Sequence, residues 1–437
     1  MRFFRNTPIA ESLRWQNVGT FLFFSLAFAI PSGYSYGAVL LLVGAALSFR
    51  WADLNQLRFS AFLLLFAFLS YSVVWGIDGV LRGEGVRELD RPLRFLLAGL
   101  VFVPLRLRPP SLVSVAAGIG LGGLSAGFVA CYDLVFNGLT RPHGFMPVNS
   151  FGMIAAIYTG FCVLLLQEFR AFRMSARLGV LLGLGAFSAL GAVLLSGSRG
   201  AYIVLLLIGL IVVYRDIKRY RLRSVRVAIV SASISLCLGL FFTIDSPLKQ
   251  RVVTAYTSTT AYISTGERIG DSIPSRLDMW TNGIDLFLEK PFFGWGETGY
   301  RATLGSRIGQ DKLVVEASNR HLHNQFVHVL VTKGLLGLFL LGLLLYAPLV
   351  GLRRPFAAAT IRADRVPSEP SSAVGALLLM IVLAYVVGGL SRTPFEHHSG
   401  VMVFSFSVVI LLALAERRPA DKAVAWRERG RRLTRPV

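Results

Sequence analysis

Apolar runs of about 16 to 25 residues recur along nearly the whole chain, and each is long enough for a helix to cross a bilayer. Only 16% of the 437 residues are charged and the mean hydropathy is +0.61, so too little polar surface remains for a water-soluble fold. The pattern predicts an all-α polytopic membrane protein with about twelve transmembrane helices. The predicted spans are Trp15–Ile30, Gly37–Phe49, Ser60–Trp75, Leu93–Leu105, Leu112–Phe136, Phe151–Leu166, Leu178–Leu195, Ala201–Tyr214, Val225–Ile244, Phe326–Leu352, Ala373–Leu390 and Val401–Leu414.

The net charge of +21 raises the question of nucleic-acid binding, and the positions of the basic residues answer it. Of the 45 lysines and arginines, 28 fall in alternate segments between spans, on one side of the membrane. The positive-inside rule makes that side cytoplasmic, with both termini there and an even number of spans. The positive charge therefore predicts contact with anionic membrane lipids and no nucleic-acid partner. The segments are Arg2–Arg14, Arg50–Arg58, Arg106–Arg108, Arg170–Arg177, Arg215–Arg226, Arg353–Arg365 and Arg417–Arg435.

Several other features bear on the N-terminus, on helix packing and on the enzyme classes that the sequence disfavours. Met1–Asn17 is basic, but no Ala-x-Ala-like cleavage site precedes the next span, so we expect the N-terminus to be retained. Cys131, Cys162 and Cys237 lie far apart inside predicted spans and are expected to be packing residues. The glycines of Gly118–Gly127 form a small-residue face that lets helices approach closely. The sequence has no Walker, Rossmann or zinc-hydrolase motif, which argues against an ATPase.

One segment on the side opposite the termini is long, namely residues 245–322 between the ninth and tenth spans. We predict a single transmembrane domain over residues 1–437 with this loop inserted in it. Ser275 and Asp278 form a capping-box pattern, which predicts the start of a helix inside the loop. This helix would lie on the outer membrane surface, where it caps the bundle, shapes a site, or does both. Its apolar stripe consists of Leu277, Trp280, Ile284, Phe287 and Leu288, and an apolar turn follows at Phe292–Gly296.

Ionisable residues are scarce inside the spans, which disfavours a carrier or channel. The notable polar residues lie where spans meet the outer face: Arg199, Arg276 and His323. All three are predicted at helix N-termini, where free amide groups and the helix dipole favour an anion, and arginine adds bidentate donors suited to phosphate. Two such arginines together suggest a pyrophosphate. The dipole also favours the neutral form of His323, which a general base requires.

Each of these residues also has a second interpretation. Arg199 at a span end fits a lipid-headgroup anchor. His323 fits an interfacial or capping histidine. The other histidines to which the same reasoning applies are His321, His328, His397 and His398.

Three motifs occur in a specific order. Ser-Gly-Ser-Arg-Gly-Ala begins at Ser196, Ser-Arg-Leu-Asp-Met-Trp begins at Ser275 with Gly-Trp-Gly downstream, and His-Asn-Gln-Phe begins at His323 and runs into Gly-Leu-Leu-Gly. From about Leu190 to Leu340 the chain thus resembles the O-antigen ligase and O-antigen polymerase superfamily. Arg141-Pro-His-Gly144 followed by Asn149 is similar to a looser segment of that family.

The resemblance implies a GT-C-like helical bundle in the bacterial inner membrane, with its site on the periplasmic face. Such an enzyme would transfer a preassembled O-antigen from undecaprenyl pyrophosphate to lipid A-core, inverting the anomeric centre. By matching motif, Arg199 and Arg276 would bind the donor pyrophosphate and His323 would activate or orient the acceptor. Many relatives have an acidic residue in the segment that here contains Lys333, so no catalytic role is assigned to Lys333. Supporting residues would be Arg141, Asn149, His321, Arg320 and Asn324.

No metal and no cofactor are predicted, because the first outer loop, Pro31–Gly37, has no acid and no Asp-x-Asp pair lies outside the membrane. Three other functions remain open: an O-antigen polymerase, a protein O-oligosaccharyltransferase with the same donor, and a polysaccharide or lipid carrier without catalysis. The single large late loop favours the ligase. Arginines that would bind a phosphorylated acceptor, or form surface ion pairs, are Arg82, Arg87, Arg91, Arg301 and Arg320.

Overall fold

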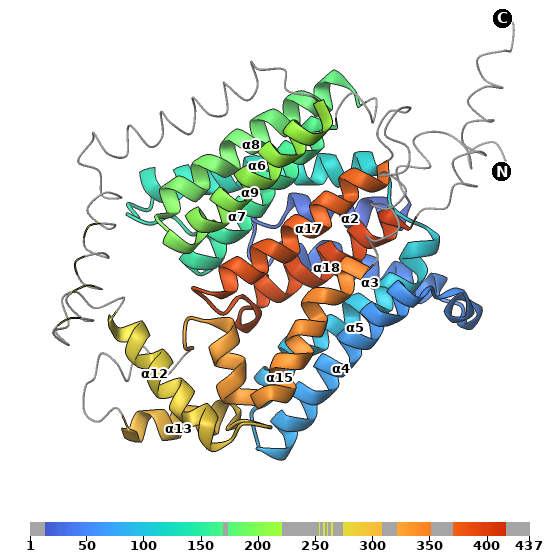
Figure 1. Cartoon of the computed structure of the whole chain (residues 1–437). Helices are drawn as coiled ribbons and strands as arrows, with labels where there is room; N and C mark the ends of the chain where they lie inside the picture. The colour runs from blue at the N-terminus through green and yellow to red at the C-terminus, as the bar shows by residue number, and fades with distance from the viewer. Residues whose placement is uncertain are drawn as a thin grey trace, which may run out of the picture.

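The computed structural model describes residues 14–168, 174–220, 274–307, 321–350 and 370–416, together with Val253, Thr257, Thr260 and Ser264. Within these ranges the chain is helical and contains no strand. The long helices lie side by side in one bundle, and two shorter helices, α12 (Pro274–Glu289) and α13 (Gly296–Arg307), lie beyond one end of it (Figure 1).

The predicted spans correspond to helices in every case that the structure describes, and the ninth, Val225–Ile244, lies outside the described residues. Six of the helices, α4, α6, α7, α8, α15 and α18, are long and apolar enough to cross a membrane. The polytopic, all-helical prediction is confirmed, whereas the count of twelve stays a prediction. The helices are α2 (Trp15–Ser25), α3 (Tyr34–Ser48), α4 (Phe59–Leu81), α5 (Val86–Leu107), α6 (Leu112–Val135), α7 (Val148–Gln167), α8 (Ala176–Ser196), α9 (Arg199–Tyr220), α15 (Gln325–Val350), α17 (Pro370–Gly389) and α18 (His398–Ala415), with 3-10 turns η2 (Trp51–Gln56) and η3 (Pro394–Glu396).

The first helix is shorter than predicted. α2 ends at Ser25, and its 11 residues cover about 17 Å, less than a hydrocarbon core. Hydrogen-bonded turns follow it, because Pro31 has no amide hydrogen to continue a helix and Ser32 adopts a left-handed conformation with φ 50°. α2 and α3 therefore form a close hairpin.

Glycines of α6 bring three helices together, as the sequence predicts. Gly118 faces the backbone of Phe21 in α2, whereas Gly123 and Gly127 face α8. A Cβ on Gly123 would lie 2.6 Å from the carbonyl oxygen of Gly185 in α8, so the two backbones touch. Among the cysteines, Cys162 is buried as predicted, but Cys131 is exposed on the surface of α6. Cys237 lies outside the described residues.

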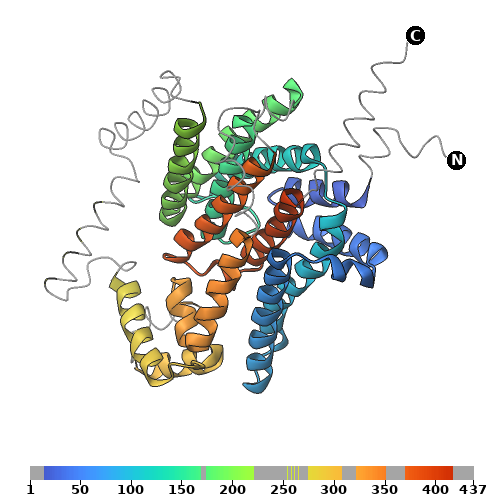
Figure 2. The same ribbon diagram turned by 45° about the vertical axis from the view of Figure 1, so that its right-hand side comes forward.

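α18 and α7 form the centre of the bundle. In α18, 89% of the most apolar window is buried, whereas the values for α4 and α8 are 33% each. Aromatic rings fill the space between α2, α7 and α18, with Phe23 stacked on Phe406 and Phe24 against Tyr158. Figure 2 shows α18 and α17 enclosed between the α6–α9 layer and the α4–α15 pair.

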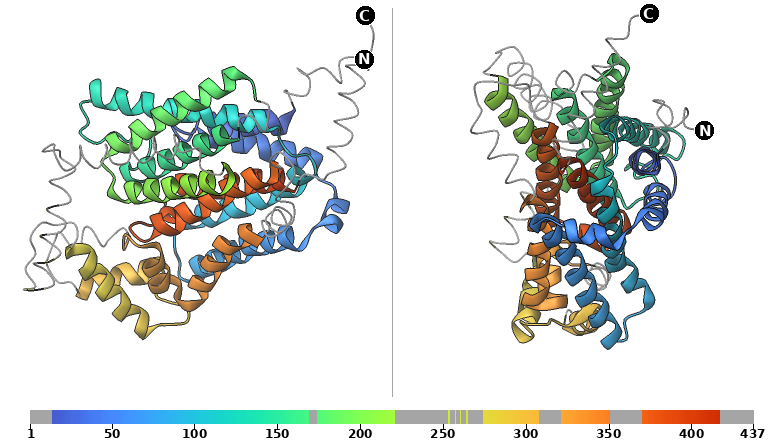
Figure 3. Two further views of the ribbon diagram at one scale, coloured as in Figure 1. Left: turned by 45° about the horizontal axis from the view of Figure 1, so that its top comes forward. Right: turned by 90° about the vertical axis from the view of Figure 1, so that its right-hand side faces the viewer.

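The two ends of the bundle differ in what they contain. At the far end, Arg106 donates to the carbonyl oxygens of Asp53 and Gln56 and lies 3.9 Å from the Glu416 carboxylate. These contacts place η2, the end of α5 and the end of α18 together. α12 and α13 lie at the opposite end, the site end (Figure 3). Two described segments predicted to be cytoplasmic, Arg50–Arg58 and Arg106–Arg108, are thus at the far end, and the loop helices are at the site end.

The loop helix α12 forms, but it is rotated relative to the predicted stripe. The described helix already includes Pro274, so Ser275 lies inside its first turn and is not its N-cap. Its buried side chains are Met279 and Leu286, which pack against α13 and the start of α15. The outward side of the stripe remains exposed and continues into the following turn as an apolar edge, which suits the predicted position at the membrane surface. This edge consists of Ile284, Leu288, Phe292 and Phe293.

Candidate functional site

The turn between α8 and α9 carries the first predicted motif. Gly197 ends α8 in the left-handed conformation with φ 61°, which glycine adopts without strain. The carbonyl oxygen of Ser198 then accepts the first hydrogen bonds of α9 from Ala201 and Tyr202, at 2.9 and 3.2 Å. Ser198 is fully buried and Arg199 is exposed. The motif therefore projects Arg199 from the N-terminus of a helix, as predicted.

Arg392 lies beside this turn, although the sequence analysis did not single it out. It belongs to the short connection between α17 and η3 and is 7% exposed. Its guanidinium donates to the Ser198 hydroxyl and, at 3.2 Å, to Oδ1 of Asn149 in the first turn of α7. Gly200 leaves the room for it, because a Cβ there would lie 3.0 Å from Arg392 Nε. Nη1 of Arg392 is buried and has no partner among the described residues.

Arg141 reaches the same turn from the connection between α6 and α7. It donates to the carbonyl oxygens of Ser196 and Gly197 at 3.2 and 3.4 Å. The connection itself is shaped by Asp133, whose carboxylate accepts from the amides of His143 and Gly144 at 2.9 and 2.7 Å. The Arg141–Gly144 segment therefore serves to place a guanidinium against the end of α8.

Arg276 and His323 enter from the loop side. Arg276 lies in the first turn of α12, and its pKa is lowered by burial and by the nearby charge of Arg199. The Trp280 indole donates to the carbonyl oxygen of Leu322 at 2.7 Å, which ties α12 to the residue before His323. Asn324 caps α15 by accepting from the amides of Phe326 and Val327 at 3.0 and 3.2 Å.

His323 has a strained backbone, with φ 52°, a value that few residues other than glycine adopt. Burial, followed by the charges of Arg276 and Arg392, lowers the pKa of His323 to about 4. The imidazole is therefore neutral near pH 7 and has a free ring nitrogen with which to accept a proton.

Arg141, Arg199, Arg276 and Arg392 together form what we call the arginine cluster, with His323 at its edge. Mutual electrostatic effects link its members: the charges of Arg276 and Arg141, after burial, lower the pKa of Arg392 to about 9. Among the described residues, no carboxylate lies within salt-bridge distance of Arg199, Arg276 or Arg392. Such a concentration of positive charge is suited to an anion with more than one charge.

A second polar layer, the buried ionic network, lies behind His323. His328 is fully buried in α15, with its Nε2 2.9 Å from a Glu297 carboxylate oxygen and 3.7 Å from Glu396. Arg91 pairs with Glu396, and Arg301 lies 3.2 Å from Glu297. The surrounding positive charges hold the pKa of Glu297 well below its usual range despite burial.

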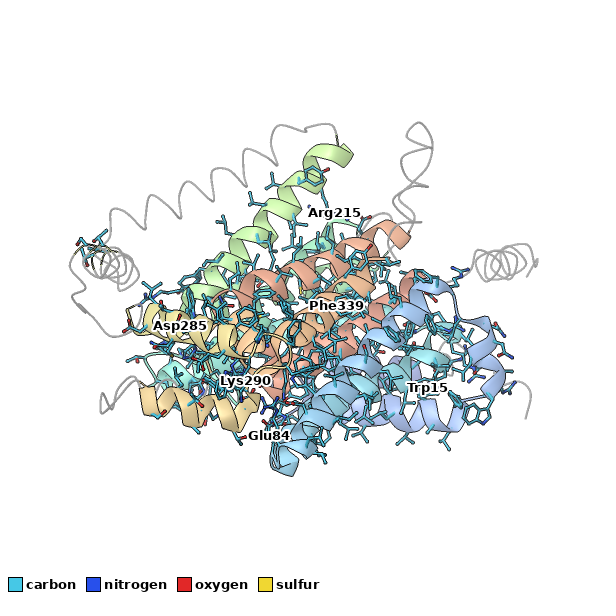
Figure 4. All side chains as sticks on the ribbon, turned by 60° about the horizontal axis from the view of Figure 1, so that its bottom comes forward. Trp15, Glu84, Arg215, Asp285, Lys290 and Phe339 are labelled. Atoms are coloured by element: carbon cyan, nitrogen blue, oxygen red, sulfur yellow. The ribbon has the colours of Figure 1, made fainter. Side chains whose placement is uncertain are left out.

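The network continues through Lys333, which is 4% exposed and pairs with Asp78 of α4. Glu84 lies 3.8 Å from Lys333 and also accepts from the Glu297 amide at 2.6 Å, which caps α13. Figure 4 shows Glu84 where the end of α4 meets α13. Lys333 thus links α15 to α4 through buried ion pairs.

Three side chains of the network approach the arrangement of a metal site. His321, His328 and Glu396 bring potential ligand atoms within 4.8 Å of one another. However, Arg91 already occupies Glu396, and Glu297 already faces Nε2 of His328. Burial and the neighbouring histidines lower the pKa of His321 to about 2, so its imidazole is neutral. The prediction that no metal takes part stays a prediction.

The structure brings Arg199, Arg276, His323, Arg141 and Asn149 together at the site end. Arg320, one of the predicted supporting residues, lies outside the described residues. Arg82, Arg91 and Arg301 form ion pairs with Asp78, Glu396 and Glu297, which favours the ion-pair interpretation of these arginines over acceptor binding. Of the rival histidines, His328 is inaccessible and His398 is exposed and paired with Asp90 at 2.9 Å. The side chain of Arg87 lies outside the described residues.

Arg392 is the functional candidate that the sequence analysis missed. The available signal was an arginine in a short connection on the predicted outer side of the membrane, where the positive-inside rule makes arginine uncommon. His397 was named only as a rival histidine. Burial lowers the pKa of His397, and the charge of nearby Arg392 also contributes. The His397 ring lies 5.5 Å from the ring of His321.

Comparison with known proteins agrees with the motifs. Residues 184–342 match the family model described as O-antigen ligase, and this range contains Arg199, Arg276 and His323. The match confirms the resemblance to the O-antigen ligase and polymerase superfamily, whose members are membrane glycosyltransferase-like enzymes acting on polysaccharide or lipid-linked substrates. A protein of Haemophilus influenzae described as uncharacterized is 28% identical over 341 residues, which is 75% of this chain and 82% of that protein.

Proposed function

We propose that this chain, which carries the O-antigen ligase family match over residues 184–342, is an O-antigen ligase. It transfers a preassembled polysaccharide from undecaprenyl pyrophosphate to a sugar hydroxyl of lipid A-core. The observation that carries the proposal is the arginine cluster, which gathers four guanidinium groups beside a neutral histidine at the ends of apolar helices. A pyrophosphate attached to a lipid has both the charge and the membrane position that this cluster requires.

In the proposed reaction, the acceptor hydroxyl oxygen attacks the anomeric carbon as the bond from that carbon to the pyrophosphate oxygen breaks. His323 takes the hydroxyl proton, a role that contributes typically about 10²–10⁴-fold. The guanidinium groups stabilise the negative charge that develops on the leaving undecaprenyl pyrophosphate, and each such donor is worth about 10²–10³-fold. Attack from the side opposite the leaving group inverts the anomeric centre.

The proposed membrane placement puts the far end of the bundle in the cytoplasm and the site end in the periplasm of the inner membrane. Residues 1–437 form one transmembrane domain, and loop 245–322 supplies Arg276 to the site. The positive charge of the far-end segments supports this orientation. The reaction uses no nucleotide, cofactor or metal, because the donor already carries a good leaving group and the arginines supply the positive charge.

The decisive experiment reconstitutes purified protein with an undecaprenyl-pyrophosphate-linked glycan and lipid A-core, without added divalent metal. We expect transfer by the wild type and loss of at least about 10²-fold in His323→Ala, Arg199→Ala and Arg276→Ala. Matched controls are His398→Ala, an exposed histidine paired with Asp90, and Arg108→Ala at the far end, and both should retain activity. A fully active His323→Ala variant would refute the proposed base.

Two outcomes would redirect the assignment. If the wild type joins two lipid-linked glycans and ignores lipid A-core, the protein is a polymerase, and a disrupted strain would then accumulate short unpolymerised units. A chelator that abolishes transfer, with recovery on adding zinc, would refute metal independence and would direct attention to His321, His328 and Glu396.

A further inference from the structure

An apolar groove runs along the outer surface of the bundle between α6 and α8. Its volume is about 690 Å³, within the range of about 300–1,000 Å³ usual for small-molecule sites. Side chains of Phe128 and Phe187 form its rims and are 71% and 78% exposed. Gly191, Ser125 and Ser188 leave its floor open, because their side chains are small. Both helices are membrane-spanning candidates, so the groove faces lipid tails.

The groove ends beside the arginine cluster. Leu195 lines its upper end, and the next residue, Ser196, offers the carbonyl oxygen that Arg141 binds. On α6 the lining extends to Cys131, two positions before Asp133, which shapes the connection that carries Arg141. From Leu121 to Cys131 the groove follows about 15 Å of helix, roughly half the thickness of the hydrocarbon core.

We propose that this groove binds the first isoprene units of the donor's polyprenyl chain, while the arginine cluster binds its pyrophosphate. The inference rests on the proposed function for the identity of the headgroup. The polarity of this surface matches that of the donor. The arginine cluster suits a multiply charged anion at the outer face, and the groove suits the apolar chain that continues from it inside the membrane. A small-residue floor between aromatic rims also leaves room for the methyl branches of an isoprenoid.

The groove can be filled without disturbing helix packing. A Cβ on Gly191 would meet no atom within 4 Å, and Gly191 lines the groove. Gly183 lies on the same helix, is equally open to a Cβ and does not line the groove. Gly191→Trp therefore fills the groove, and Gly183→Trp is a matched control with the same change in helix propensity and bulk.

With the full-length donor, we expect Gly191→Trp to raise the donor KM at least about tenfold, because the chain loses its binding surface. kcat should change little, and Gly183→Trp should behave as the wild type. With a donor whose pyrophosphate carries a methyl group in place of the isoprene chain, wild type and Gly191→Trp should be equal. If Gly191→Trp matches Gly183→Trp with the long donor, the groove does not bind the chain.

A binding measurement separates this inference from the proposed function. An undecaprenyl pyrophosphate with a diazirine in its first isoprene units should label α6 or α8 peptides, and Gly191→Trp should lose this labelling even if no transfer is detected. Inactive wild type with groove labelling would overturn the ligase proposal alone. Labelling elsewhere, or equal labelling by a diazirine phospholipid that the pyrophosphate does not displace, would overturn the groove as a polyprenyl site.

Discussion

A guanidinium buried beside other arginines needs negative charge from some source. Arg392 receives only neutral oxygens from Ser198 and Asn149 among the described residues, and the charges of Arg276 and Arg141 oppose its own. Bound pyrophosphate would remove this conflict, so the free protein holds the cluster in a state that favours the anion.

Arg392→Lys tests whether the shape of the guanidinium matters in addition to its charge. Lysine keeps the charge but lacks the planar set of donors that joins α7, the α8–α9 turn and the bound anion. We expect a loss of about 10-fold or more in kcat/KM for the donor, with normal expression and thermal stability. Arg94→Lys, in an i,i+4 pair with Asp90 outside the cluster, is the control and should be unchanged. Wild-type kinetics in Arg392→Lys would remove Arg392 from the site.

The pH dependence of the reaction follows from His323. Its pKa of about 4 in the free protein keeps the imidazole neutral above that pH, so kcat/KM should be flat from about pH 5 to 8 and fall only below this range. Bound pyrophosphate adds negative charge next to His323 and raises its pKa, so the acid limb of kcat should lie at higher pH than that of kcat/KM. Equal limbs in the two profiles would contradict the proximity of His323 to the bound anion.

At this scale, sequence identifies residues that belong to motifs and misses those that do not. Arg199, Arg276 and His323 stand in ordered motifs at helix starts, so their types and positions could be predicted. Arg392 stands in a connection without a motif, and it joins the site only because α17 packs beside α9, a tertiary contact that local patterns do not contain.

At the scale of elements, contacts with a neighbouring turn change the course of α15. Its helix breaks at Gly334, with φ 64° and ψ −158°, and the turn after α12 fills the break. The carbonyl oxygen of Pro291 accepts from the Leu335 amide at 2.7 Å, and the Val331 carbonyl accepts from Trp295 at 2.9 Å. The break and the turn therefore satisfy each other's backbone groups.

Gly334→Ala should separate the break in α15 from the turn after α12. Alanine is strained at this φ, and its Cβ would collide with the backbone of Phe292, so we expect a loss of stability of about 2 kcal/mol or more. A thermal-shift assay in detergent would show a lower Tm. Gly342→Ala on the same helix, where a Cβ meets no atom, should leave the Tm equal or raise it. An unchanged Tm in Gly334→Ala would show that the turn does not depend on the break.

Sequence patterns predict the existence of such elements better than their orientation. The loop helix α12 was predicted near its observed position, yet Met279 and Leu286, outside the predicted stripe, are its buried residues. α12 has apolar residues on more than one side, and packing against α13 and α15 selects the buried side, whereas Ile284 and Leu288 remain outside. Periodicity alone does not distinguish a face that meets protein from one that meets lipid.

For the whole molecule, hydropathy and charge predict the bundle because the bilayer limits the chain to helices that satisfy their own backbone. The alternation of basic segments also predicts which ends lie together, and the contacts of Arg106 with η2 and Glu416 agree with that grouping. Helix order in space, and therefore the groove and the cluster, depends on close contacts such as Gly123 with Gly185, which composition does not contain.

Cysteine labelling tests the orientation of the bundle. In a variant with the native cysteines replaced by serine, an impermeant maleimide should label Thr140→Cys in intact spheroplasts, because this exposed residue lies at the site end. Asn55→Cys, exposed in η2 at the far end, should react only after permeabilisation. The reverse pattern would place the arginine cluster in the cytoplasm and would contradict the proposed periplasmic reaction.

The position of Arg392 after α17 also bears on how the protein is made. The cluster draws on segments before α7, at α9, at α12 and finally between α17 and η3, close to the end of the chain. A ribosome-bound chain that has inserted only its earlier helices holds Arg141 and Arg199 without the group that joins them through Ser198 and Asn149. The proposed site is thus completed only when the connection after α17 joins the bundle, so a chain that stops before α17 should not bind the proposed donor.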